Sequence, residues 1–304
     1  MNVVEVCNLG KRYGKHWAIK ECSLSIPSGH VVALVGPNGA GKTTLLHCAV
    51  GLVEPSTGYT EVFGGLEAGS PEALARIAFV AQDAPLYKYL TVDQIIELTR
   101  NLNRGFDTNL ALHRLDDLGI DPHQKVGRLS GGQQSQLALA LAIARHPDLL
   151  VLDEPLARLD PLARNEFMGV VMAAVAEDGL SVVLSSHVVS ELERVANYLI
   201  VLNVGRLQIA SEIDELLENH LLLTGPVDEI AHVANSFDVV QTFRGDRQAR
   251  LLVRSPEITD VGPNWEASQV SLEELILAYL RDPHSSALSP PVAHGTPSVH
   301  GVRS

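Results

Sequence analysis

The chain has 304 residues and is 46% hydrophobic, which is enough for one large domain or two modest ones with a sizeable core. It carries 23 Lys and Arg residues against 36 Asp and Glu residues, so its formal net charge is −13. This excess of negative charge argues against electrostatic binding of nucleic acid, although the net charge does not exclude a local basic patch. We expect no nucleic-acid partner.

In chain order, the first expected elements are two antiparallel strands, Val3–Cys7 and Cys22–Ile26. Beyond them, short runs rich in β-branched residues indicate buried strands at Val31–Val35, Ile77–Val80, Leu149–Leu152, Ser181–Ser185 and Tyr198–Leu202. Helical patterns alternate with several of them at Lys42–Val50, Val92–Leu102, Gly132–Ala144 and Leu162–Ala176. This alternation predicts an α/β fold with a mainly parallel sheet that is covered on both faces.

Two regions depart from the alternation. Around residues 84–147 the helices follow one another without strands, which predicts an α-helical subdomain inserted into a sheet domain that spans 1–212. For residues 213–281 we expect a small α+β module with strands and helices at Leu221–Leu223, Asp228–Ser236, Val239–Phe243, Ala249–Val253 and Ser271–Arg281. The last stretch, 282–304, is rich in Pro, Ser, Gly and His, and its composition predicts disorder.

A glycine-rich segment follows the expected strand Val31–Val35 and fits the P-loop pattern G-x-x-x-x-G-K-[ST]. Its residues are Gly36, Pro37, Asn38, Gly39, Ala40, Gly41, Lys42 and Thr43, with Thr44 next in the chain. Such glycines let backbone N–H groups converge on phosphate oxygens at a helix N-terminus. Lys42 is then expected to neutralise the β- and γ-phosphates, and the Thr43 hydroxyl to bind Mg²⁺.

Two carboxylates end the expected strand Leu149–Leu152. Asp153 is placed to reach Mg²⁺ through water, and Glu154 to polarise an attacking water molecule. Acidic residues also end strands simply because they meet solvent. The functional interpretation therefore depends on the P-loop that precedes them in the chain.

The segment Leu129-Ser130-Gly131-Gly132-Gln133 precedes the expected helix Gly132–Ala144. Ser130 suits the N-cap of that helix, which is the structural interpretation of this residue. Two adjacent glycines, however, expose several backbone N–H groups at the positive end of a helix, and such an end binds anions. The sequence thus contains a second candidate phosphate-binding segment.

The P-loop, Leu129–Gln133 and the Leu-Asp-Glu-Pro segment at 152–155 occur in an order that resembles the nucleotide-binding subunit of ABC transporters. The resemblance covers residues 1–212 and implies a P-loop NTPase core that binds and hydrolyses ATP with Mg²⁺. It also implies that two subunits, a second copy or a homologous ATPase subunit, enclose two ATP molecules. Each ATP then lies between the P-loop of one subunit and Ser130, Gly131, Gly132 and Gln133 of the other.

The same resemblance implies further roles for single residues. Tyr13 resembles the aromatic residue that stacks on adenine, although a packed strand-end tyrosine is an alternative and Trp17 is a competitor. Gln82 resembles the glutamine that contacts Mg²⁺ and water and responds to the membrane partner. His187 resembles the histidine that contacts the γ-phosphate, and Asp160 resembles the aspartate of the D-loop, the segment that follows the catalytic glutamate.

Two departures from the family pattern concern the link between the two ATP sites. Ala157-Arg158 stands before Leu159-Asp160, where the family usually has Ser-Gly or Ser-Ala. Gln134-Ser135-Gln136 stands where basic residues commonly follow the signature. Neither change removes an expected ligand of Mg²⁺ or of the γ-phosphate, so we expect active sites.

The sequence offers no membrane span of its own, because the longest apolar run, Leu137–Ala144, is far shorter than the roughly 20 residues that a spanning helix needs. The N-terminus shows no signal-peptide pattern, and the unpaired cysteines Cys7, Cys22 and Cys48 suit a reducing compartment as buried small side chains. We expect a subunit on the cytoplasmic face of a membrane that drives a separate integral-membrane permease.

Three kinds of ABC protein fit these motifs. The single ATPase domain and the short C-terminal module favour a transporter subunit over a soluble ABC ATPase that acts on ribosomes or DNA. The hydrolytic residues Lys42, Asp153, Glu154 and His187 argue against a non-catalytic scaffold. The closing segment Ser271–Leu280 resembles the end of ATPases that drive drug or antibiotic exporters, so export is the expected direction, although an ordinary docking helix has the same pattern.

Overall fold

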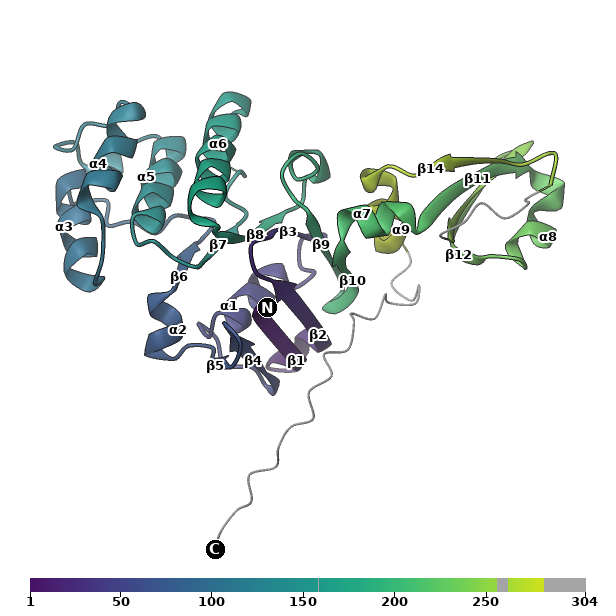
Figure 1. Ribbon diagram of the computed structural model, residues 1–304, viewed down its shortest axis with the longest axis horizontal. Coiled ribbons are helices and arrows are strands. Elements are labelled where there is room, and N and C mark those ends of the chain that lie inside the picture. Colours follow the sequence, from purple (N-terminus) through teal and green to yellow (C-terminus); the bar gives the residue numbers. More distant parts are fainter. Residues whose placement is uncertain (158, 256–261, 282–304) are drawn as a thin grey trace, which may run out of the picture.

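The computed structural model describes residues 1–157, 159–255 and 262–281, and Arg158, the stretch 256–261 and the expected tail at 282–304 lie outside the described residues (Figure 1). Three sheets organise the described chain. In Figure 1 the helices α3, α4 and α5 lie at one end of the molecule, and the sheet that contains β11 and β12 lies at the other end. The α/β class expected from the alternating pattern is confirmed.

The central sheet has the order β10-β9-β3-β8-β7-β6. Five of its strands are parallel and match the expected ones to within one residue at each end: β3 (Val31–Val35), β6 (Ile77–Val80), β7 (Leu149–Asp153), β8 (Ser181–Ser186) and β9 (Tyr198–Asn203). Every residue of β3, β7, β8 and β9 is buried, as expected for strands covered on both faces. The edge strand β10 (Arg206–Glu212) pairs antiparallel with β9 and was not expected from the sequence.

An antiparallel sheet with the order β2-β1-β4-β5 forms the N-terminal part. The expected strand pair is confirmed and is longer than expected, because β1 (Asn2–Tyr13) and β2 (His16–Pro27) pair along most of their lengths. The strands β4 (Thr57–Val62) and β5 (Leu66–Glu67) complete this sheet and were missed. The sheet and helix α1 (Lys42–Ala49) enclose one apolar core against one face of the central sheet.

The opposite face of the central sheet packs against α5 (Gly131–Ile143), α6 (Pro161–Asp178) and α9 (Leu272–Arg281). Helix α3 has the expected bounds Val92–Leu102, and together with α4 (Thr108–Asp117) and α5 it surrounds a separate apolar cluster. The short helices α2 (Pro71–Ala75), α4 and α7 (Ile213–Glu218) were not expected. None of the helices in the described ranges is long and apolar enough to cross a membrane.

The C-terminal sheet has the order β12-β13-β11-β14. The three expected strands are present as β11 (His220–Pro226), β12 (Asp238–Arg244) and β13 (Gln248–Arg254), and the short strand β14 (Glu266–Gln269) was missed. The helix expected at Asp228–Ser236 is broken instead into a 3₁₀ turn, Val227–Glu229, and the short helix α8, Ile230–Ala234. Helix α9 joins this sheet to the central core, where Asn203 Nδ2 donates a 2.8 Å hydrogen bond to the carbonyl of Leu280.

Candidate functional site

The glycine-rich segment connects the end of β3 to the start of α1. Gly39 and Gly41 have φ angles of +82° and +104°, a region that L side chains rarely adopt. A Cβ atom on Gly41 would lie 2.5 Å from the carbonyl oxygen of Ala18, and one on Gly36 would lie 2.2 Å from that of Leu202. Backbone atoms are in the way in both cases, so the path of this loop requires glycine at both positions.

Lys42 begins α1, and its side chain is turned back over the loop. Its Nζ atom donates a 2.8 Å hydrogen bond to the carbonyl of Gly36 and lies 3.1 Å from Oε1 of Glu154. Only 6% of the residue is exposed, so its charge is balanced within the site rather than by solvent. The residue therefore presents a fixed cation at the N-terminus of α1.

The end of β7 places two carboxylates one after the other. Ser185, which pairs with Asp153 across β7 and β8, donates a 2.7 Å hydrogen bond from Oγ to Oδ1 of Asp153. The backbone N–H of Glu154 in turn donates to Ser185 Oγ at 2.8 Å. Ser185 thus locks the turn that follows β7, and sequence reasoning missed it because its role depends on the pairing of two strands.

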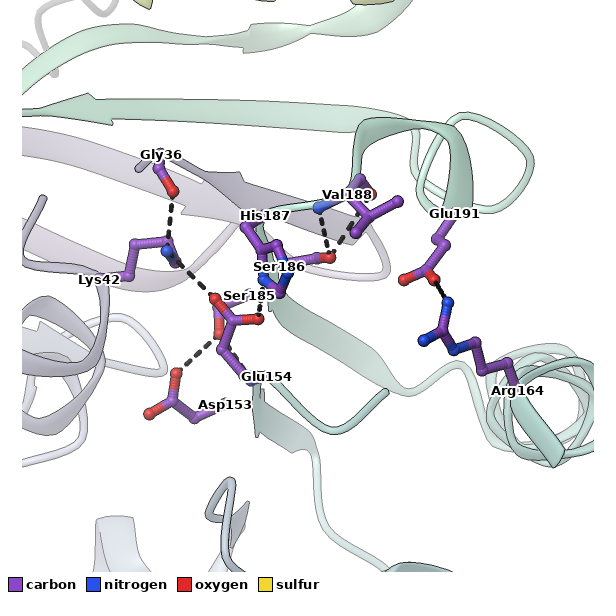
Figure 2. Close-up of polar contacts among 10 residues, drawn as sticks. All are labelled: Gly36, Lys42, Asp153, Glu154, Arg164, Ser185, Ser186, His187, Val188 and Glu191. Carbon is purple, nitrogen blue, oxygen red and sulfur yellow. Dashed lines mark hydrogen bonds and ion pairs between the residues drawn. The ribbon is translucent and has the colours of Figure 1, made fainter. Parts of the chain in front are cut away.

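Glu154 has a φ angle of +48°, which is uncommon for a residue other than glycine. Its carboxylate lies between two nitrogen atoms, with Oε1 at 3.1 Å from Lys42 Nζ and Oε2 at 2.8 Å from Nδ1 of His187 (Figure 2). The Glu154 side chain is 11% exposed and that of His187 is 50% exposed. Backbone conformations of this kind collect at functional sites, where surrounding contacts hold them.

These groups border a cavity of about 400 Å³. Its lining contains most of the residues expected at the nucleotide site, and one that was not expected, Ala18; they are Tyr13, Ala18, Asn38, Gly39, Gly41, Lys42, Thr43, Thr44, Gln82, Glu154 and His187. Asp153 lies behind the lining and is 3% exposed. Gly36 and Ala40 shape the loop without lining the cavity, and the sequence carries no local signal for Ala18.

The two aromatic candidates differ in their surroundings. Tyr13 ends β1, is 51% exposed and lines the cavity, with Lys11 Nζ 5.3 Å from the centre of its ring. Trp17 does not belong to the lining, and the guanidinium of Arg12 lies 5.6 Å from its ring centre. The geometry therefore favours Tyr13 over Trp17 as a ring that faces the cavity.

The segment Ser130–Gln133 does not belong to the lining of this cavity. Ser130 is the N-cap of α5: its Oγ accepts a 3.1 Å hydrogen bond from Gln133 N–H, and the Gln133 side chain accepts a 3.0 Å bond from Ser130 N–H. A Cβ atom on Gly131 would meet no atom within 4 Å, so the backbone at this helix end is open. The structure thus keeps the second candidate phosphate-binding segment apart from the first within one chain.

Asp160 also lies outside the cavity lining, where its Oδ1 caps α6 by accepting 3.0 Å hydrogen bonds from the N–H groups of Leu162 and Ala163. Of the two unusual residues before it, Ala157 is exposed and Arg158 lies outside the described residues. In the other departure, Gln134–Gln136, Ser135 and Gln136 are buried, and the Gln134 side chain donates to the Leu129 carbonyl at 3.0 Å.

Comparisons with known proteins agree with this geometry. The family described as ABC transporter matches residues 19–157. The lantibiotic transport ATP-binding protein SrtF of Streptococcus pyogenes is 33% identical over 72% of this chain and 98% of its own length. The ABC transporter ATP-binding protein YtrB of Bacillus subtilis is 27% identical over 91% of this chain and 97% of its own length.

Among solved structures, one similar chain is the ATP-binding cassette MJ0796, a dimer in a post-hydrolysis state with bound ADP and Pi. Its TM-score is 0.62 at 27% sequence identity, and the match covers 69% of this chain and 98% of that one.

Proposed function

The chain belongs to the ABC transporter family as one of its ATP-binding, ATP-hydrolysing subunits, and on that premise we propose that two copies of it close around two ATP molecules. The observation that supports the proposal is the separation of two candidate phosphate-binding helix ends. The start of α1 borders the cavity, whereas Ser130–Gln133 at the start of α5 does not belong to the lining of the cavity. A second copy would bring its own Ser130–Gln133 segment to the open side of this cavity.

For the nucleotide itself, the loop and the aromatic ring have separate tasks. Backbone N–H groups of Gly39 and Gly41 would bind phosphate oxygens, and Lys42 would exchange its bond to the Gly36 carbonyl for a phosphate oxygen. Tyr13 has half of its surface exposed beside the cavity and would stack on the adenine.

Mg²⁺ would fit oxygen donors at this cavity, two of them in its lining and the third buried. They are the Thr43 hydroxyl, the Gln82 amide oxygen and the Asp153 carboxylate, and oxygen donors are the ligands that Mg²⁺ prefers. The hydrogen bond from Ser185 holds the Asp153 carboxylate in place, as partners behind a metal ligand do. When bound, Mg²⁺ would neutralise charge on the ATP phosphates.

Hydrolysis needs a base for the attacking water. Glu154 would accept its proton, because its carboxylate is 11% exposed at the cavity wall and is held by two nitrogen atoms. His187 would orient Glu154 and contact the γ-phosphate with its other ring nitrogen, since Nδ1 already faces the carboxylate. Lys42 would leave Glu154 for the phosphates when ATP binds.

We place the subunit on the cytoplasmic face of a membrane, bound to a separate permease. A groove of about 250 Å³ follows Gln82 along the chain and lies between β6, α3 and α5; its lining includes Ala84, Pro85, Leu86, Thr99 and Arg145. An apolar groove with a polar rim suits a helix of a membrane protein. Because Gln82 also lines the nucleotide cavity, a helix that binds in this groove would move Gln82 and so act on the bound nucleotide.

The tyrosines beside this groove provide the contact to test. Tyr87 and Tyr89 are 54% and 70% exposed, with ring centres 5.9 Å apart, whereas Leu86 and Leu90 pack against the cluster of α3, α4 and α5. These four residues therefore have two roles: the leucines support the helices, and the two tyrosine rings remain on the surface. Such exposed neighbouring rings mark a contact surface.

Tyr87→Glu should therefore abolish capture of the subunit by its membrane partner and leave basal ATP hydrolysis unchanged. Tyr59→Glu is the matched control, because Tyr59 is 53% exposed on β4 in the N-terminal sheet. Pull-down from detergent-solubilised membranes and an ATPase assay measure both properties. Equal capture of both variants would contradict this docking surface.

We propose export as the direction of transport, because the end of α9 resembles exporter ATPases. The relatives include proteins named for antibiotic transport and proteins named for import. Examples are the bacitracin transport ATP-binding protein BcrA of Bacillus licheniformis and the thiamine import ATP-binding protein ThiQ of Escherichia coli. Inside-out vesicles that contain the complex would decide: ATP added outside should load them with an exported drug or antibiotic, and ATP-driven release would indicate import.

A further inference from the structure

One arginine on α6 contacts two segments that flank the nucleotide cavity. Arg164 Nε donates a 2.9 Å hydrogen bond to the carbonyl of Leu159, the residue before Asp160. Its Nη1 atom forms an ion pair with Oε1 of Glu191 (Figure 2). The two side chains are 35% and 16% exposed, so the pair is partly shielded from solvent.

These contacts join the D-loop to the segment that carries His187. Glu191 ends a 3₁₀ turn, Val189–Glu191, that begins two residues after His187. Ser186 Oγ folds this segment back by accepting a 3.0 Å hydrogen bond from Val188 N–H. The planar guanidinium offers donors in fixed directions, so one side chain can hold both segments at a fixed separation.

We propose that Arg164 is a positioning residue for ATP hydrolysis: by tying Leu159 to Glu191 it sets where His187 lies against Glu154. The inference rests on the proposed roles of His187 and Glu154, whose side chains are 2.8 Å apart. It adds a consequence for the dimer, because Asp160 lies one residue beyond the Leu159 carbonyl. A partner copy that presses on the D-loop would shift His187 through Arg164.

Helix α6 does not depend on this arginine for its stability. Asp160 caps its first turn, and Phe167, Met168, Val171 and Ala174 bury its inner face in the main core. A partly exposed ion pair adds little to the free energy of unfolding, typically below about 1 kcal/mol. A purely structural role for Arg164 would thus give a small loss of stability and no change in turnover per folded molecule.

Arg164→Gln should lower kcat on the order of tenfold and leave the KM for ATP nearly unchanged, because misplacement of a catalytic group by a fraction of an ångström affects the reaction more than binding. Glu191→Gln should have the same effect, since it breaks the same link. Arg206→Gln is the matched control: it removes a 3.1 Å ion pair with Glu21 that lies outside the cavity.

The decisive readout is the double variant with His187→Ala. If Arg164 acts through His187, Arg164→Gln should cause no further loss of kcat in the His187→Ala protein. Equal fractional losses in both backgrounds, or a wild-type kcat for Arg164→Gln, would overturn the inference. Melting temperatures of each variant separate these results from misfolding, and Glu191→Gln provides the second test of the link should Arg164→Gln not fold.

Failure of the proposed function would give a different set of results from failure of the positioning role. A His187→Ala protein with wild-type kcat would remove the proposed role of His187 itself. A slow His187→Ala protein beside a wild-type Arg164→Gln protein would reject the positioning role alone.

Discussion

The N-termini of α1 and α5 are two candidate phosphate sites in one chain, and they are built differently. At α1 the N-cap is Gly41, no side chain caps the helix, and Lys42 supplies a buried cation. At α5 the Ser130 side chain caps Gln133 N–H, and the first turn contains no charged side chain. Both ends offer backbone N–H groups to an anion, but the cation and the carboxylates lie at the first.

This difference between the two helix ends indicates that they have different roles in the site. The α1 end holds Lys42, Asp153 and Glu154 in one hydrogen-bonded group, so it can bind and activate a nucleotide. The α5 end can add only neutral N–H and hydroxyl donors to a phosphate that another site already holds. In the proposed function, a chain with one end of each kind supplies half of each composite site, and the predictions below test that relation in order of expected effect.

The largest effect is expected from Glu154→Gln, which removes the base and keeps the shape of the side chain. Hydrolysis should fall by about 100-fold or more, as for loss of a general base, while ATP binding persists. The ATP-bound dimer should then accumulate on gel filtration with ATP and Mg²⁺. A variant that hydrolyses ATP at the wild-type rate, or that stays monomeric with ATP, would contradict the assignment.

Gly131→Asp changes the N-terminus of α5 and leaves the N-terminus of α1 unchanged. The fold should tolerate it, since a Cβ atom at Gly131 meets no atom within 4 Å and an acidic residue suits the first turn of a helix. Its carboxylate should repel the phosphates that the other copy holds, and turnover should drop on the order of 100-fold, as for loss of an oxyanion donor.

Gly169→Asp on α6 provides the control for that variant. Gly169 is exposed, and a Cβ atom there also meets nothing within 4 Å. Turnover and melting temperature should both stay near the wild-type values. If Gly131→Asp retains full turnover as well, the α5 end takes no part in the site.

The smallest effect is expected at a polar cluster outside both helix ends. His220 is buried, with Nδ1 2.7 Å from the Leu216 carbonyl and Nε2 2.9 Å from the Tyr279 hydroxyl. That hydroxyl accepts a 3.0 Å hydrogen bond from Arg254. Burial lowers the pKa of His220 below 6.5, and the cation of Arg254 lowers it further, against opposing contributions from the Leu216 carbonyl and Asp238.

The sign of the pH effect follows from this pKa. Below pH 6.5 the unfolded chain binds a proton at His220 before the folded chain does, so the free energy of unfolding should decrease as the pH falls through that range. His220→Gln should remove this part of the pH dependence, and it should leave ATP turnover at neutral pH unchanged. Thermal melts between neutral and mildly acidic pH measure it, and an unaltered pH profile would contradict the explanation.

The sequence predicted the parts of the fold whose signals are local. The buried strands β3, β7 and β9 consist almost entirely of apolar residues, and β8 contains the run Val182–Leu184; the positions of all four are confirmed. Two of the missed edge strands lack that signal: all of β14 is at least partly exposed, and β10 follows a tight turn at Val204-Gly205 with two positive φ angles. A valine in that conformation gives no sequence signal of a hairpin.

The residues of the candidate site also fall into those that the sequence could predict and those that it could not. Lys42 and Glu154 could be selected from motifs, and His187 and Gln82 only through the family resemblance; all four lie around one cavity, while their roles remain proposals. Ser185 and the Arg164–Glu191 pair could not be found, because their contacts join residues 32 and 27 positions apart through tertiary packing. The limits of the domains also stay predictions.

The central claim is that each ATP site contains the α1 end of one copy and the α5 end of another, and mixing two inactive variants tests it most directly. Lys42→Ala and Gly131→Asp should each be nearly inactive alone. A mixed dimer, isolated from cells that express both with different tags, pairs an intact α1 end with an intact α5 end at one of its two sites. By symmetry, the isolated mixed dimer should contain half of the wild-type number of intact sites and show up to about half of the wild-type ATPase activity, whereas an unsorted random mixture would show up to about a quarter. Activity no higher than that of the two variants measured alone would contradict the composite site.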